Sequence, residues 1–196
     1  MKANHLGIRY HLFRGAALLT VACFIVTLLV GCKAEEQPPE EVEMTLAVSS
    51  AAFQEGGKIP ASYTCEGRDV SPALTWGEPP AGTQSFALIM DDPDAPGGVF
   101  THWVLFNLPA DSRELPEAVP TQPQLSDGSL QGKNDFGKTG YGGPCPPSGR
   151  PHRYQFTLYA LDQTLDLKAG ASKKQAIDAM QGHILAQGRL TGTYQR

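Results

Sequence analysis

The sequence predicts a mainly antiparallel β fold with one or two short helices. Short apolar runs are separated by segments rich in proline and glycine, of which the 196-residue chain has 16 and 21. The two longest runs, VFTHWVLFNL (99–108) and HRYQFTLYALD (152–162), have the length and composition of long strands. One segment near the C-terminus carries the signals of a capped helix.

Three shorter runs precede or flank these strands. MTLAVSS (44–50) alternates between apolar and polar residues, as a half-buried strand does. LTW (74–76) lies directly before a turn with two prolines and a glycine. SFALIM (85–90) is almost continuously apolar, which is typical of a strand buried on both faces. We therefore expect all three to be strands.

The helix is predicted from its caps. Ser172 and Gln175 form a capping-box pattern at its start, and Gly188 is expected to end it. Three apolar residues are expected to line one face: Ile177, Met180 and Ile184. RLTGTY (189–194) then predicts a last strand.

Residues 1–31 have the pattern of a secretory signal. Lys2, Arg9 and Arg14 precede an apolar stretch at 16–30, and this stretch is short for a helix that spans a membrane. The segment ends Leu-Val-Gly-Cys at 29–32, which resembles a bacterial lipobox, so we expect Cys32 to be acylated. The alternative is a plain signal anchor with a chance cysteine.

The segment that follows is predicted to be a tether. Residues 32–44 are acidic, contain prolines and lack apolar periodicity, and a folded domain is expected over 45–196. Because Lys33 is not the aspartate of an inner-membrane retention signal, we expect the anchor in the outer membrane, facing the periplasm. Loss of the three basic residues in 1–31 changes the formal net charge from −4 to −7. A negative domain is a poor candidate for binding nucleic acid.

Cys65 and Cys145 remain in the exported domain, in a compartment where disulfides persist. A disulfide between them and a pair of small buried thiols are both compatible with the sequence. Metal binding by two isolated cysteines is the weaker interpretation.

Two histidines point to a pocket. Strict alternation would place His102 on one face with Phe100, Val104 and Phe106, and His152 on one face with three apolar or aromatic residues, Tyr154, Phe156 and Leu158. Asp92 and Asp94 lie in the turn that leads to the first histidine's strand, and we expect them to orient the imidazoles.

A glycine- and proline-rich loop, KTGYGGPCPP (138–147), would complete this pocket through close backbone approach. Each feature also has a purely structural explanation. The aspartates are compatible with an Asx turn, the histidines with core positions, and the glycines and prolines with an ordinary loop.

Several motifs resemble the phosphatidylethanolamine-binding protein family, in particular its bacterial Raf-kinase-inhibitor-like branch. They are DPDAP (92–96), THWVLFN (101–107), YGGPCPPSG (141–149) and HRYQFTLYALD (152–162). The resemblance extends over nearly all of 45–196. It implies an antiparallel β-sandwich with a pocket for anions such as phosphoryl headgroups. The pocket motif falls on six residues here: Asp92, Asp94, His102, Gly143, Pro144 and His152.

One position departs from the pattern of the animal members, which have paired histidines where this chain has Thr101-His102. Their kinase-binding surface lies outside the quoted motifs, so the resemblance does not carry kinase inhibition to this chain.

Together these observations predict a lipid-anchored envelope protein that binds an anionic small molecule or phospholipid headgroup, without a cofactor. One alternative is a modulator or inhibitor of a partner protein, similar to a kinase or protease inhibitor, and the sequence leaves such a partner and a homodimer open. A second is an Asp/His metal-dependent hydrolase. No nucleophile-elbow or His-x-x-x-His motif supports an enzyme.

Overall fold

The computed structural model describes residues 46–196. Within this range no helix combines the length and the apolar character needed to cross a membrane. The predicted signal peptide at 1–31, the lipidated Cys32 and the tether at 32–44 lie outside the described residues and stay predictions.

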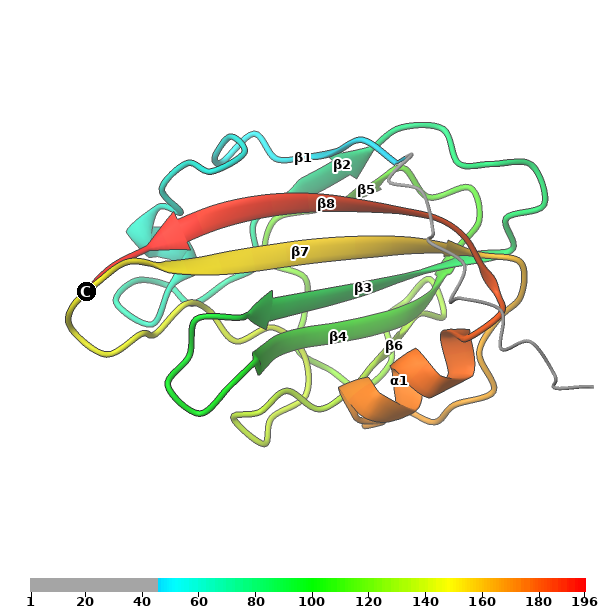
Figure 1. The fold of residues 1–196 in the computed structure, drawn as a ribbon. Coiled ribbons are helices and arrows are strands. Elements are labelled where there is room, and N and C mark those ends of the chain that lie inside the picture. Colours follow the sequence, from blue (N-terminus) through cyan, green and yellow to red (C-terminus); the bar gives the residue numbers. More distant parts are fainter. Residues whose placement is uncertain (1–45) are drawn as a thin grey trace, which may run out of the picture. The chain divides into compact units, whose positions relative to one another are not determined.

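The larger sheet has five antiparallel strands (Figure 1). In spatial order they are β6 (Leu130–Gln131), β4 (Phe100–Pro109), β3 (Ser85–Asp92), β7 (His152–Leu161) and β8 (Ile184–Tyr194). Both runs that were predicted as long strands are present, as β4 and β7. Because β3 lies between them, the three strands form the centre of the sheet.

A smaller sheet packs against one face of the larger one. It contains β1 (Val48–Ser49), β2 (Leu74–Trp76) and β5 (Glu114–Leu115), and a 3-10 helix, η1 (Ala61–Tyr63), lies between β1 and β2 in the chain. An apolar cluster that includes Trp76 and Leu115 joins it to Leu88 and Trp103 of the larger sheet. These layers confirm the predicted mainly β fold with two antiparallel sheets.

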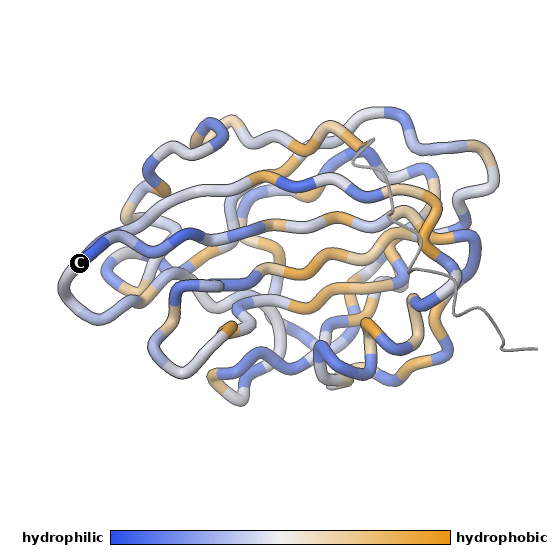
Figure 2. The backbone as a smooth tube through the Cα atoms, in the orientation of Figure 1, coloured by the Kyte–Doolittle hydropathy of each residue, from blue (hydrophilic) through white to orange (hydrophobic). Residues whose placement is uncertain are grey.

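The other face of the larger sheet is covered by α1 (Lys173–Met180). Ala176 and Met180 of this helix pack against Ile89, Val104 and Phe106. Strand β3 therefore contributes to both apolar clusters, and its residues 85–90 are all buried, as their continuous apolar run predicted. Figure 2 shows apolar residues along the middle of β3 and β4 and hydrophilic residues where β3 ends.

The start of α1 is as predicted, but its end is not. Ser172 accepts a hydrogen bond from the backbone of Gln175, and the Gln175 side chain accepts one from the Ser172 backbone, which completes the capping box. The helix ends at Met180, and Gly182 has a φ of +78°. Ile184 belongs to β8, not to the helix, because the whole segment pairs with β7. Gly188 lies inside that strand, where the Leu46 backbone leaves no room for a side chain.

Candidate ligand-binding site

Three of the predicted site residues, Asp92, His102 and His152, come from strand ends that meet at one end of the sheet. Strand β3 is antiparallel to both neighbours, so its last residues lie beside the first residues of β4 and β7. This pairing places Asp92 opposite Phe100, at the end where β7 begins with His152. Residues 92, 102 and 152 therefore come together although they are far apart in the chain.

A cavity of about 150 Å³ opens at this end of the sheet. Three polar side chains line it: Asp92, His102 and His152. The remaining lining residues are mostly apolar: Ala95, Pro96, Phe100, Phe136, Cys145, Pro146 and Pro147. The volume is below the range typical of pockets for drug-sized ligands, so the cavity suits a small group or the headgroup of a larger molecule.

His152 is held by Asp92. The distance from its Nδ1 to Oδ2 of Asp92 is 2.7 Å, and both side chains are about 95% buried. A carboxylate oxygen accepts this hydrogen bond, so Nδ1 carries the proton. The Nε2 atom has no partner among the described residues and is left for a ligand. The other oxygen of Asp92 accepts from the backbone of Asp94, at 2.8 Å, so the Asx turn and the histidine contact coexist.

His102 is held by the loop rather than by an acid. Its Nδ1 donates to the carbonyl oxygen of Gly142 at 2.7 Å, and the Gly142 N–H donates to the His102 carbonyl at 3.0 Å. Burial lowers the pKa of His102 below its usual value; the hydrogen bond to Gly142 and the charge of Asp92 partly oppose this. When the ring is neutral and Nδ1 carries the proton, Nε2 is unprotonated and is an acceptor.

The face on which His102 lies corrects the expectation from strict alternation. Met90 pairs with Trp103 and Asp91 with Thr101, so His102 is an extra residue in a β-bulge of β4. The bulge puts the His102 ring against Tyr154, at a centroid distance of 5.2 Å, on the side of the sheet that faces the smaller sheet. Val104 and Phe106 pack on the opposite face, under α1. On β7, which is regular here, Tyr154, Phe156 and Leu158 share one face as predicted.

Aromatic rings enclose the imidazole of His102. Phe100 and Phe136 contact it at centroid distances of 5.2 and 5.3 Å, and they contact each other at 4.8 Å. The Tyr154 hydroxyl is buried and has no hydrogen-bond partner among residues 46–196. Burial raises the pKa of Tyr154 far above its usual value, and the charge of Asp92 adds to this, so the hydroxyl keeps its proton. It is a donor close to the site.

Asp94 has a different role from the one predicted. It orients neither histidine and does not line the cavity. Its carboxylate accepts three hydrogen bonds from Arg153, from the backbone N and from Nε and Nη2, at 2.8–2.9 Å. These bonds hold the pKa of Asp94 well below its usual range. Asp94 therefore fixes the turn before β4 to the start of β7.

Gly143 and Pro144 also lie outside the cavity, although they were expected to approach a ligand. The Gly143 N–H donates to Oδ1 of Asp69 at 2.7 Å, and the Pro144 carbonyl accepts from the Cys65 N–H at 3.2 Å. A Cβ on residue 143 would lie 2.4 Å from the carbonyl oxygen of Tyr63. Glycine is therefore required because two backbone segments meet there, and the loop acts through its neighbours, residues 142 and 145–147.

Cys65 and Cys145 form a disulfide in the structure, with their Cα atoms 5.4 Å apart. Of the arrangements that the sequence left open, this is the one present. The bond attaches the segment after η1 to the wall of the cavity, because Cys145 is itself a lining residue.

Two residues of the site were missed by reasoning from the sequence. Tyr154 had a signal, since it lies two positions after His152 and therefore on the same face of a strand. Phe136 had none, because its loop reaches the cavity only through tertiary packing.

Among residues 46–196 no group of three or more His, Cys, Asp or Glu side chains is arranged to hold a metal ion. Instead, Nδ1 of His152 is bonded to the Asp92 carboxylate, and Nδ1 of His102 is bonded to the backbone carbonyl of Gly142.

Comparison with known proteins agrees with this architecture. The family model described as phosphatidylethanolamine-binding protein matches residues 49–195. A UPF0098 protein of Methanothermobacter thermautotrophicus is 56% identical over 145 residues, which cover 74% of this chain and 95% of the relative. A UPF0098 protein of Aquifex aeolicus is 52% identical, over 77% of this chain and 89% of the relative. Neither name describes an enzyme.

Two solved structures share the fold. One is a putative phosphatidylethanolamine-binding protein homolog, CT736, from Chlamydia trachomatis, with a TM-score of 0.71 and 38% identity over 79% of this chain and 99% of that one. The other is Escherichia coli YbcL, described as a member of the mammalian family, with a TM-score of 0.72 and 34% identity over 77% of this chain and 98% of that one. This chain belongs to the phosphatidylethanolamine-binding protein family.

Proposed function

We propose that this protein is a lipid-anchored envelope protein that binds a phosphoryl group in the cavity between Asp92, His102 and His152. One observation carries the proposal. Both imidazoles use Nδ1 for protein contacts, which leaves two Nε2 atoms for one ligand in a small cavity with largely apolar walls. Family membership supports a binding protein of this general kind.

The protonation of the imidazoles decides which ligand fits. A neutral ring that donates through Nδ1 can only accept at Nε2, so it binds a protonated phosphate oxygen. A protonated ring donates at Nε2 and therefore binds a phosphate oxygen that carries no proton. Because Nδ1 of each ring is already bonded to the protein, a protonated ring offers one donor, at Nε2, to the anion.

The carboxylate of Asp92 gives the site a second basis for selecting its ligand. This carboxylate repels an anion, but it attracts an ammonium group that lies beside the phosphoryl group, as in phosphorylethanolamine. The headgroup of a phospholipid and a free phosphate ester share this chemistry. We therefore expect a ligand that combines a phosphoryl group with a nearby cation to bind better than inorganic phosphate.

The affinity for inorganic phosphate should fall as pH rises, by up to about tenfold per pH unit. The pKa of free His102 lies below its ordinary value of about 6.5, so binding of an ionised phosphate requires uptake of a proton. His102→Ala should weaken binding near pH 6 by about 10- to 100-fold, because one charge-assisted hydrogen bond is lost, and should reduce the pH dependence. Isothermal titration calorimetry across this pH range measures both effects.

Asp111→Asn is the control, since it removes an exposed carboxylate that does not line the cavity. Its affinity should stay within about twofold of the wild type. Equal affinities of folded wild type and His102→Ala at every pH would remove His102 from the site. Parallel titrations with phosphorylethanolamine and a short-chain phosphatidylethanolamine distinguish a soluble ester from a lipid headgroup as the source of the ligand.

The envelope location is tested at Cys32. Cys32→Ser should release the protein from the membrane fraction or leave an uncleaved precursor, because the acyl chains have no attachment point. Cell fractionation and intact-mass measurement separate these two results. A variant that is cleaved and still sediments with the membrane would show that the lipobox interpretation is wrong.

A further inference from the structure

A second cavity, of about 170 Å³, adjoins the phosphoryl site proposed above, and we call it the adjoining cavity. The two cavities share two lining residues, Phe136 and Cys145. The charged side chains of Asp69 and Lys138 line the adjoining cavity, whereas the walls of the phosphoryl site are mostly apolar. The adjoining cavity therefore suits a polar group, such as the hydroxyls of a glycerol group.

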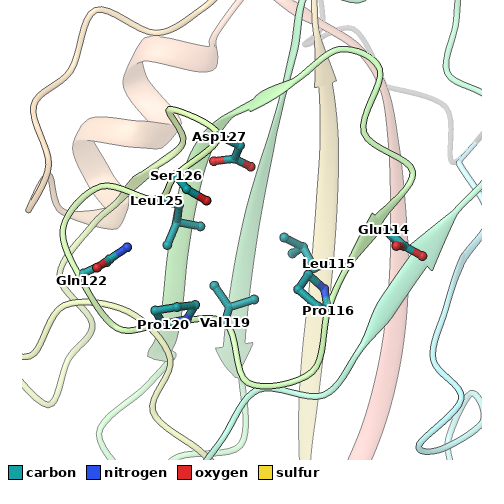
Figure 3. A pocket seen from close by; sticks show the side chains of 9 residues that line it. All are labelled: Glu114, Leu115, Pro116, Val119, Pro120, Gln122, Leu125, Ser126 and Asp127. Atoms are coloured by element: carbon teal, nitrogen blue, oxygen red, sulfur yellow. The ribbon is translucent and has the colours of Figure 1, made fainter.

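A third cavity, of about 160 Å³, lies at the edge of the smaller sheet. Figure 3 shows three of its apolar residues, Leu115, Val119 and Leu125, directed toward a common space. It shares no lining residue with the phosphoryl site or with the adjoining cavity. A ligand that extends beyond the phosphoryl site therefore has the adjoining cavity, and not this one, as its neighbour.

The wall between the phosphoryl site and the adjoining cavity has two fixed parts. One is the disulfide, because Cys65 and Cys145 both line the adjoining cavity. The other is the pair of hydrogen bonds that joins His102, which lines the phosphoryl site, to Gly142, which lines the adjoining cavity. Neither part moves aside without the loss of a covalent bond or of buried hydrogen bonds.

The third part of the wall is the ring of Phe136. It packs edge-to-face against Phe100 and His102, at centroid distances of 4.8 and 5.3 Å. It also lies against Gly142, where a Cβ would be 2.7 Å from Cδ2 of the ring. Phe136 is 43% exposed, and rotation of its side chain breaks no hydrogen bond. Its ring is therefore the part of the wall that a substitution can remove or displace.

We propose that Phe136 determines which phosphate esters the site accepts, an inference that rests on the proposed function. The ring separates the phosphoryl site from the adjoining cavity, so a monoester with one small substituent fits, while the second substituent of a diester is kept out of the adjoining cavity. Without the ring, the two cavities would form one space about twice as large as the phosphoryl site. This space would hold the glycerol group of a glycerophosphodiester.

The test is calorimetric titration of phosphorylethanolamine and glycerophosphoethanolamine into the purified full-length protein and its variants. The wild type should bind the monoester more tightly. Phe136→Ala should reduce this preference about three- to tenfold, because the glycerol group then enters the adjoining cavity. The ratio of the two affinities is the quantity to compare, since it cancels any general loss of phosphoryl binding.

Gly142→Ala is a second variant, which displaces the ring without removing it. The added methyl group would occupy the position of the Phe136 ring edge, so the ring must move aside. The backbone carbonyl that accepts from His102 is retained. The preference for the monoester should therefore fall in this variant as well.

Leu185→Ala is the control, because Leu185 is 39% exposed but lies in β8 and lines neither cavity. It should keep the wild-type preference. A ratio that is unchanged in Phe136→Ala, or that falls equally in Leu185→Ala, would overturn the role of Phe136 and leave the phosphoryl site intact. Failure of the wild type to bind phosphorylethanolamine would instead contradict the proposed function, and this inference with it.

Discussion

Replacing Cys65 and Cys145 by serine should lower the free energy of unfolding by about 4 kcal/mol. The disulfide closes a loop across a sequence separation of 80, and the loss of this constraint raises the conformational entropy of the unfolded chain. The native contacts between the same segments remain, because the Tyr141 hydroxyl donates to the Tyr63 carbonyl at 2.7 Å and Gly143 is bonded to Asp69. We therefore expect a less stable protein with an intact cavity.

Urea denaturation of the double variant and the wild type, each with and without reductant, measures this difference. Reductant should destabilise the wild type by a similar amount and leave the double variant unaffected. In alkylated, non-reduced wild type, mass spectrometry should find both cysteines unmodified. Alkylation of both under denaturing conditions would contradict the disulfide.

Asp92→Ala should be the most damaging substitution within the ligand site, with a loss of about 3 kcal/mol in the free energy of unfolding. The change leaves Nδ1 of the buried His152 and the backbone N–H of Asp94 without their acceptor. It should also weaken phosphate binding at least tenfold, because His152 loses the contact that directs its Nε2 atom to the ligand.

Asp92→Asn separates these effects. Its amide oxygen still accepts from the Asp94 N–H, and its NH2 group donates to Nδ1 of His152 once the imidazole proton moves to Nε2. The side chain has the same size, so we expect a loss of only about 1 kcal/mol. Thermal denaturation and phosphate titration of both variants provide the comparison. If Asp92→Ala were as stable as Asp92→Asn and bound phosphate equally well, Asp92 would not hold His152 in the way that the geometry indicates.

Local patterns in the sequence were sufficient to predict the strands and the helix start that depend on residues close together in the chain. The apolar run of β3 predicted burial on both faces, and Ser172 and Gln175 predicted the start of α1, because burial along a strand and a capping box are encoded within a few residues. The approximate positions of β4 and β7 followed from their length and composition for the same reason.

The end of α1 required the tertiary structure. Ile184 continues the helical spacing of Ile177 and Met180, but residues 184–194 pair with β7 along almost their whole length when they form a strand. The pairing with a distant segment therefore outweighs the local pattern, and Gly182, with its positive φ, makes the change of direction possible.

The candidate site was predicted as a set of residues but not as an arrangement. Sequence alone gave Asp92, His102 and His152, which do meet, and it grouped with them Asp94, Gly143 and Pro144, which support the surrounding loops from outside the cavity. The bulge at His102, the carbonyl of Gly142 that fixes its tautomer, and the Phe136 ring against it were decided only in three dimensions. These three features depend on the register between paired strands or on contacts between loops. Register and loop contacts produce no periodic pattern in the sequence, so they could not be predicted from it.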